Sequence, residues 1–133
     1  MVDMKKNIMV VDDSALMRRV MCDIINLDNS LQVTEVSRNG EEAYQKIKSI
    51  KFDAIVLDIN MPKMNGIEFL KIMRENEKLK NISVFVMTTS NEDSDKINAY
   101  NLNVAGYILK PLSFEKFLTS VATLKNFWQL CEM

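Results

Sequence analysis

The chain has 133 residues, of which 47% are apolar and 26% are charged, and this predicts one soluble domain with its own core. Seventeen Lys and Arg residues against eighteen Asp and Glu residues give a formal net charge of −1. That balance lacks the basic excess of a dedicated nucleic-acid-binding domain, so we expect no direct nucleic-acid partner. The sequence contains no histidine, which excludes Ser-His-Asp triads, Cys-His dyads and histidine-based zinc sites.

The N-terminal residues and the two cysteines are typical of a cytoplasmic protein. Cys22 and Cys131 lie far apart and form no CxxC motif, so we expect both to be free thiols in a reducing compartment. The first apolar run, at 8–11, is too short for the core of a signal peptide or for a membrane span. We therefore expect a cytoplasmic protein that does not associate with a membrane.

Short apolar runs that are rich in β-branched or aromatic residues predict buried strands. In chain order the predicted strands cover 8–11, 32–37, 54–57, 84–87 and 107–109. Residues 32–37 alternate less regularly than the others, which is typical of an edge strand.

Segments with helical spacing of apolar residues separate these strands. The first helix is expected to begin after a capping Asp13 or Ser14. Its predicted buried face consists of Leu16, Val20, Ile24 and Leu27. The later helices are predicted after Gly40 and over 67–75, 92–102 and 113–130. The alternation of strands and helices predicts a parallel sheet with helices on both faces.

Polar residues follow four of the predicted strands at their carboxyl ends. They are Asp12, Asp13, Asp58, Thr88 and Lys110. In an open parallel sheet these ends meet at one edge, where ligands bind. Each residue alone has an ordinary structural explanation, since an aspartate can cap a helix and a lysine can be a solvated charge. Three carboxylates together, however, repel one another unless a cation neutralises them.

The expected chemistry of this edge is phosphoryl transfer. Lys110 supplies one positive charge, and a surplus of carboxylate oxygens without histidine or cysteine fits Mg²⁺ best. Mg²⁺ beside a lysine is typical of phosphate chemistry. A carboxylate held next to both can itself be the nucleophile and form an aspartyl phosphate.

Four motifs that span nearly the whole chain resemble the receiver domain of two-component response regulators. They are VVDDS at 10–14, VLDINMPKMNG at 56–66, MTTS at 87–90 and YILKP at 107–111. The resemblance implies a flavodoxin-like, doubly wound α/β fold with five helices and a five-stranded parallel sheet in the order 2-1-3-4-5. It implies a single receiver domain over 1–133, with a core over roughly 6–125 and no output domain in this chain. The first half looks like receivers of chemotaxis methylesterases, and the second half like stand-alone receivers related to phytochrome partners.

The resemblance also implies which residues accept the phosphoryl group and hold the metal. By this likeness Asp58 is the phosphoacceptor. Asp13 binds Mg²⁺ directly, and Asp12 holds it largely through water. Asp58 and the backbone carbonyl of Asn60 complete the expected set of protein ligands.

The resemblance implies that residues in and after the last two strands bind the phosphoryl group and respond to it. Thr88 and Lys110 would bind its oxygens, and Tyr107 matches an aromatic residue that changes rotamer with activation. Three further positions of the family pattern are Thr89, Ser90 and Pro111. Ser90 and Asn60 are expected to flank the path of the water that hydrolyses the acyl phosphate.

By this resemblance the protein is a phosphoaccepting signalling switch, with no enzymatic activity beyond its own phosphorylation and dephosphorylation. The donor would be a histidine kinase or a histidine phosphotransfer protein, since this chain has no histidine of its own. An alternative is a metal-dependent phosphohydrolase that turns over an aspartyl phosphate at Asp58. Such enzymes place a general acid two residues after the nucleophile, and that position is Asn60 here.

Two surfaces are candidate partner sites. The family docks its kinase on the first helix, where Met17, Arg18 and Met21 are candidates, although both methionines could equally well complete the packing of the helix. Output is expected through the fourth helix, the fifth strand and the fifth helix, towards a downstream protein or a homodimer. Phe127 and Trp128 near the end of the last helix either fold back onto the core or anchor such a contact.

Overall fold

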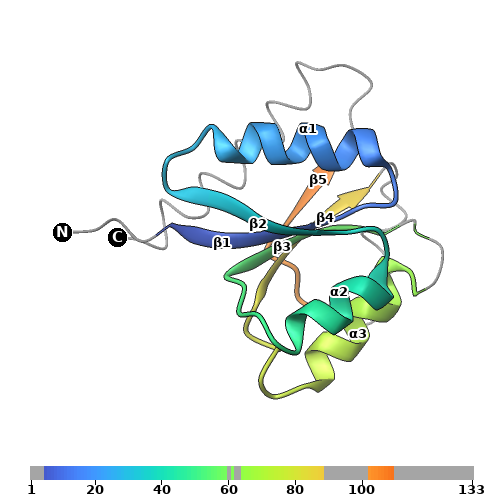
Figure 1. Cartoon of the computed structure of the whole chain (residues 1–133). Coiled ribbons are helices and arrows are strands. Elements are labelled where there is room, and N and C mark those ends of the chain that lie inside the picture. Colours follow the sequence, from blue (N-terminus) through green and yellow to red (C-terminus); the bar gives the residue numbers. More distant parts are fainter. Residues whose placement is uncertain (1–4, 60, 62–63, 89–101, 110–133) are drawn as a thin grey trace.

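The computed structural model describes residues 5–59, 61, 64–88 and 102–109, which form one parallel sheet with helices on both faces (Figure 1). The strands are β1 (Lys6–Val11), β2 (Leu31–Ser37), β3 (Ala54–Asp58), β4 (Ser83–Thr88) and β5 (Gly106–Leu109). The helices within these ranges are α1 (Ala15–Asn26), α2 (Gly40–Ile47) and α3 (Gly66–Glu75). The helix expected over 113–130 lies outside the described residues, as does nearly all of the helix expected over 92–102.

The sheet has the predicted order, β2-β1-β3-β4-β5, and every neighbouring pair is parallel. The chain therefore reverses its direction of winding between β1 and β3, the kind of position at which doubly wound sheets bind ligands. The prediction that residues 32–37 form an edge strand is confirmed, because β2 pairs only with β1.

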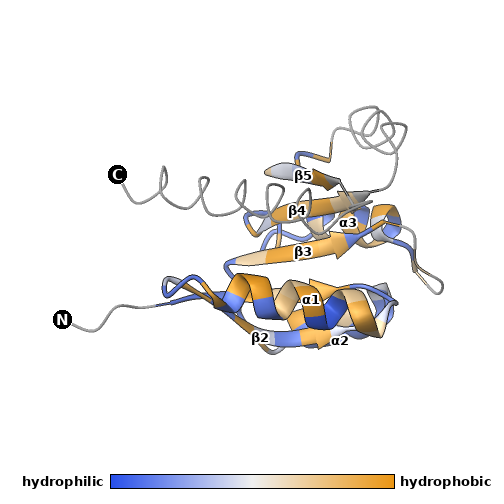
Figure 2. Ribbon diagram, turned by 90° about the horizontal axis from the view of Figure 1, so that it is seen from above, coloured by the Kyte–Doolittle hydropathy of each residue, from blue (hydrophilic) through white to orange (hydrophobic). Residues whose placement is uncertain are grey.

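Two apolar layers cover the sheet, one under α1 and the other under α2 and α3 (Figures 1 and 2). Alternate residues of β1 face opposite layers: Ile8 and Val10 pack with α1, whereas Met9 and Val11 pack with α2 and α3. Both sets are fully buried. Burial on both faces explains why the central strands appear in the sequence as unbroken apolar runs.

The predicted buried face of α1 was wrong at both of its ends. Leu16 is 71% exposed and Leu27 is 78% exposed, and the buried residues of the helix are Met21, Ile24 and Ile25. The helix carries apolar residues on both sides of the true face, so spacing alone selected a stripe rotated away from it. Because Met21 has no exposed surface, it belongs to the core and not to a docking surface.

Side-chain caps start each helix directly after the strand or loop before it. The Ser14 hydroxyl accepts a hydrogen bond of 3.2 Å from Met17 N–H, and Asn39 caps α2 in the same way. Asn65 and Glu68 form a reciprocal capping box at the start of α3. Because the capped helices begin soon after the strands end, their N-termini lie at the carboxyl edge of the sheet. None of the described helices is long and apolar enough to cross a membrane.

Candidate functional site

Asp12 and Asp58 lie side by side because of the register between β1 and β3. Val11 pairs with Leu57 across these strands, so the next residue of each chain segment is an aspartate at the same height. Both aspartates are fully buried, whereas the neighbouring Asp13 is exposed. One carboxylate oxygen from each of the three residues lies within 4.8 Å of the other two. The predicted convergence of these three side chains is confirmed.

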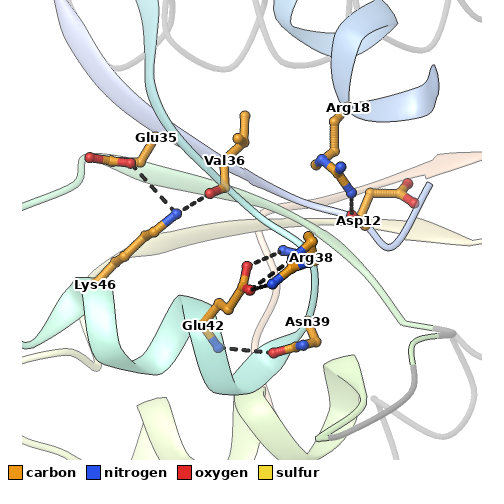
Figure 3. A network of polar contacts seen from close by, with 8 residues as sticks. All are labelled: Asp12, Arg18, Glu35, Val36, Arg38, Asn39, Glu42 and Lys46. Carbon is orange, nitrogen blue, oxygen red and sulfur yellow. Dashed lines mark hydrogen bonds and ion pairs between the residues drawn. The ribbon is translucent and has the colours of Figure 1, made fainter. Parts of the chain in front are cut away.

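Asp12 is held in place from three directions. Its N–H donates to Ser37 O on β2 at 3.0 Å, and its Oδ1 accepts a hydrogen bond of 2.9 Å from Ser14 N–H. Arg18 Nη1, from the end of the first turn of α1, donates to the backbone carbonyl of Asp12 at 2.8 Å (Figure 3). The turn that carries Asp12 and Asp13 is therefore fixed to both the sheet and the helix.

The backbone after Asp58 is held equally closely. Ile59 N–H donates to Met87 O of β4 at 3.3 Å, and Ile59 O accepts a hydrogen bond of 3.0 Å from Gly66 N–H. A Cβ on Gly66 would lie 2.7 Å from both Asp58 O and Ile59 Cα, a separation too short for real Cβ atoms. The first residue of α3 must therefore lack a side chain for the helix to start against Asp58.

The remaining predicted residues divide between described and undescribed positions. Thr88 is the last residue of β4 and pairs with Leu109, while its predecessor Met87 pairs with Asp58. The backbone thus places Thr88 at the same edge as the aspartates. Tyr107 is partly buried against the apolar layer of α2 and α3. The other predicted positions, Asn60, Thr89, Ser90, Lys110 and Pro111, lie outside the described residues.

The three aspartates fit a hard divalent cation. Carboxylate oxygens are the preferred protein ligands of Mg²⁺, which keeps several of its waters. The two buried carboxylates can bind such an ion from the protein side. The exposed carboxylate lies where the ion is open to solvent and can keep its waters. Cation binding also relieves the mutual repulsion of three negative charges at this spacing.

Comparison with known proteins decides the family. Residues 8–122 match the family model described as the response regulator receiver domain. The chain belongs to the response regulator receiver family. Receiver domains are phosphoacceptor signalling switches, and nothing in the comparisons or in the described residues favours the phosphohydrolase alternative.

Individual relatives include both subclasses that the sequence resembles. The chain is 35% identical over 107 residues to a protein-glutamate methylesterase/protein-glutamine glutaminase of Syntrophomonas wolfei, an alignment that covers 80% of this chain and 30% of that protein. The receiver thus spans under a third of that relative. The phosphorylated cyanobacterial phytochrome response regulator RcpA is similar in structure, with a TM-score of 0.83, 27% identity and 94% coverage of both chains.

A third similar structure concerns the metal. The Mn²⁺-bound form of response regulator Rcp1 has a TM-score of 0.79 and 29% identity, with 92% of this chain and 94% of that chain covered. Mn²⁺ and Mg²⁺ both favour carboxylate and water ligands. The acidic cluster of this receiver is of the type that such ions occupy.

Sequence reasoning missed two residues that shape the site, Arg18 and Gly66. Arg18 was considered only as a docking residue, yet its guanidinium holds the backbone of Asp12. Gly66 was included only as the last residue of the motif at 56–66, with no role assigned to it. Glycine is a poor helix former, so a glycine in the first turn of a helix indicates that something approaches that position closely. This was the signal in the sequence that could have identified Gly66.

The cysteine prediction is confirmed for Cys22, which is a free thiol on α1. Burial and the neighbouring Asp23 raise the pKa of this thiol, which makes it a poor nucleophile. Cys131 lies outside the described residues.

Proposed function

We propose that Asp58 is the residue of this receiver that accepts the phosphoryl group. The observation that supports this assignment is the acidic cluster itself, because its three carboxylates surround the end of β3, where Asp58 is fully buried at the centre of the sheet. Of the three aspartates, Asp58 alone lies within a strand, and that strand, β3, pairs with β1 and with β4. Asp12 and Asp13 come together from the turn after β1 and are the natural metal ligands.

Asp12, Asp13 and Asp58 would hold Mg²⁺ together with the backbone carbonyl of Asn60. The bound ion supplies positive charge that screens the carboxylates from the incoming phosphoryl oxygens. The contribution of the chain is to keep its oxygens in place beforehand. The fixed turn at Asp12, tied to Ser37 and Arg18, serves that purpose.

In the transfer step an Asp58 carboxylate oxygen attacks the phosphorus atom of the donor. A new O–P bond forms as the P–N bond of a phosphohistidine breaks, and the leaving imidazole takes the bond's electron pair and a proton from solvent. Thr88 and Lys110 would bind the phosphoryl oxygens after transfer. The product is an acyl phosphate on Asp58, and its hydrolysis returns the receiver to its starting state.

Thr88 and Tyr107 would change position in response to the new charge, and this would alter the surface of the receiver. A phosphoryl group adds nearly two negative charges, and its contacts are worth a few kcal/mol at most, so the two conformations must lie that close in free energy. Tyr107 is partly buried against the apolar layer of α2 and α3, and a partly buried ring is compatible with two ring positions.

The proposed donor is a histidine kinase or a histidine phosphotransfer protein in the cytoplasm, because this chain has no histidine of its own. The proposed output surface comprises the helix expected over 92–102, β5 and the helix expected over 113–130. It would contact either a downstream protein or a second copy of the receiver.

Intact-protein mass spectrometry tests the assignment to Asp58. Treatment with acetyl phosphate or phosphoramidate and Mg²⁺ should add one phosphoryl group to the wild type and none to Asp58→Ala. A matched control is Asp53→Ala, which removes an exposed carboxylate just before β3, at the opposite edge of the sheet. Equal labelling of Asp58→Ala and wild type would overturn the assignment. Steady turnover of a small phosphate ester would instead support the phosphohydrolase.

A further inference from the structure

The N-terminus of α2 contacts the loop between β3 and α3 at Met64. Gly40 N–H donates a hydrogen bond of 3.1 Å to Met64 O. A Cβ built on Gly40 would lie 2.4 Å from that same oxygen, and 2.9 Å and 3.0 Å from the Met64 side chain. Real Cβ atoms essentially never approach a heavy atom more closely than 3.0 Å. The contact therefore leaves no room for any side chain at residue 40.

The backbone conformation of Gly40 does not itself require glycine. Among the described residues no glycine has a positive φ, and Gly40 is the first helical residue of α2. Alanine would be the better helix former at such a position. Close approach to Met64 is thus the physical reason for a glycine here.

The contact with Met64 is connected to Asp58 through a short run of backbone. Met64 has a φ of 55°, and the next residue, Asn65, caps α3. Gly66 then presses against Asp58 O and Ile59 Cα at the separation that excludes a Cβ. Both close contacts include backbone atoms, which cannot turn away as a flexible side chain can. A displacement at Met64 would therefore be passed on to the end of β3.

The first turn of α2 is stiff enough to act as a support. Asn39 Oδ1 accepts a hydrogen bond of 2.9 Å from Glu42 N–H (Figure 3). The Glu42 carboxylate accepts hydrogen bonds of 2.9 Å and 2.8 Å from Arg38 N–H and Arg38 Nε. Arg38 also holds the pKa of Glu42 below its usual value, so these contacts persist at neutral pH.

We propose that Gly40 is a positioning residue for the phosphorylation site, which sets the height of the β3–α3 loop against Asp58. This inference rests on the proposed function of Asp58 and its Mg²⁺ ligands. A side chain at residue 40 forces Met64 to recede by more than half an ångström before the contact becomes tolerable. Mg²⁺ requires nearly ideal octahedral geometry, so a shift of that size that reaches Asp58 through Gly66 weakens its binding.

Mg²⁺ titration by calorimetry, together with urea unfolding without Mg²⁺, tests the proposal. Gly40→Ala should raise the Mg²⁺ dissociation constant by about tenfold, the lower end of what loss of a supporting contact costs at metal sites. The control is Ile47→Val, which loosens the buried side of the same helix at its other end, the last residue of α2. Ile47→Val should lower stability but leave the dissociation constant within about twofold, since it changes no contact of the metal site.

A second variant covers the case in which Gly40→Ala does not fold. Asn39→Ala introduces no clash but removes the acceptor that fixes the first turn of α2, so it should raise the dissociation constant more than Ile47→Val does. Equal Mg²⁺ affinities of the residue 39 and 40 variants and Ile47→Val would overturn the positioning role alone. Failure of the wild type to bind Mg²⁺ would overturn the proposed metal site, and the role of Gly40 with it.

Discussion

Arg18 reaches from α1 to the backbone carbonyl of Asp12, with 2.8 Å between Nη1 and the oxygen (Figure 3). The contact fixes the turn that carries two of the three clustered carboxylates, and it brings a positive charge to the acidic edge of the sheet. Arg18 is partly buried, so solvent does not fully screen this charge.

Replacing Arg18 with alanine should weaken Mg²⁺ binding by about tenfold, because Asp12 loses one of its supports. The loss of a charged hydrogen bond should also lower the free energy of unfolding by about 1 kcal/mol. Calorimetric Mg²⁺ titration and urea unfolding measure the two effects. Arg19→Ala is the matched control, since Arg19 is exposed on the same helix. Identical Mg²⁺ affinities of the two variants would contradict a supporting role for Arg18.

Neutralising Asp13 should have opposite effects with and without Mg²⁺. Without the ion, Asp13→Asn should melt about 1–3 °C above the wild type, because one of three neighbouring negative charges is gone. With saturating Mg²⁺ the wild type should gain the larger stabilisation, since ligand binding stabilises in proportion to ln(1 + [Mg²⁺]/Kd). Differential scanning calorimetry at both conditions checks this, with Asp23→Asn as an exposed control on α1. A lower melting temperature for Asp13→Asn without Mg²⁺ would show that other contacts of Asp13 outweigh the repulsion among the carboxylates.

Ser90 is predicted to leave open the path of the water that hydrolyses the acyl phosphate. Ser90→Leu should therefore lengthen the lifetime of phosphorylated Asp58, by about tenfold if the side chain blocks in-line approach. The decay of the added mass after removal of the phosphodonor measures this lifetime. Ser49→Leu, at an exposed position after α2, is the control for a general effect of the leucine. Unchanged decay in Ser90→Leu and in variants of Asn60 would contradict the prediction.

The aromatic residues near the end of the chain are predicted to support association after phosphorylation. Sedimentation of the receiver with Mg²⁺ and beryllofluoride, a mimic of the phosphoryl group, should reveal a dimer that Trp128→Ala weakens. The free protein is the reference state. A monomer in both states, unaltered by Trp128→Ala, would exclude the homodimer and leave two alternatives, aromatics that fold back onto the core or a contact with a different protein, while phosphorylation of Asp58 would be untouched.

Arg74 on α3 should be a main contributor to the stability of the β4–β5 side of the fold. Its guanidinium donates to four backbone carbonyls, those of Lys80, Ile82, Leu102 and Asn103, at 2.7 to 3.2 Å. Burial lowers the pKa of Arg74, although an arginine stays charged at neutral pH.

Substitution of Arg74 by methionine keeps the apolar stem and removes these bonds. It should lower the free energy of unfolding by about 2–3 kcal/mol, less than the full value of four charged hydrogen bonds because the site is partly open to water. Urea unfolding measures the loss. Arg19→Met, which removes an exposed guanidinium, should change stability by no more than about 0.5 kcal/mol. A similar effect of both substitutions would contradict the role assigned to Arg74.

The strands and the edge that carries the site could be predicted from the sequence because both depend on local patterns. A strand that is buried on both faces must be apolar throughout, as at 54–57, and the structure extends that strand only to Asp58. Alternation of strands and helices makes the sheet parallel, and a parallel sheet brings the residues after its strands to one edge. Asp12, Asp13 and Asp58 could be grouped for that reason before their distances were known.

The contacts that shape the site depend on segments far apart in the chain, and only the tertiary structure decided them. Register between β1 and β3 sets Asp12 level with Asp58, and no local pattern encodes that register. The buried face of α1 follows from its rotation on the sheet, which apolar residues on several sides of the helix left ambiguous. Gly40 contacts Met64 because α2 and the β3–α3 loop pack together. In the sequence, the sign of such a close approach is a glycine at a helical position that glycine does not favour.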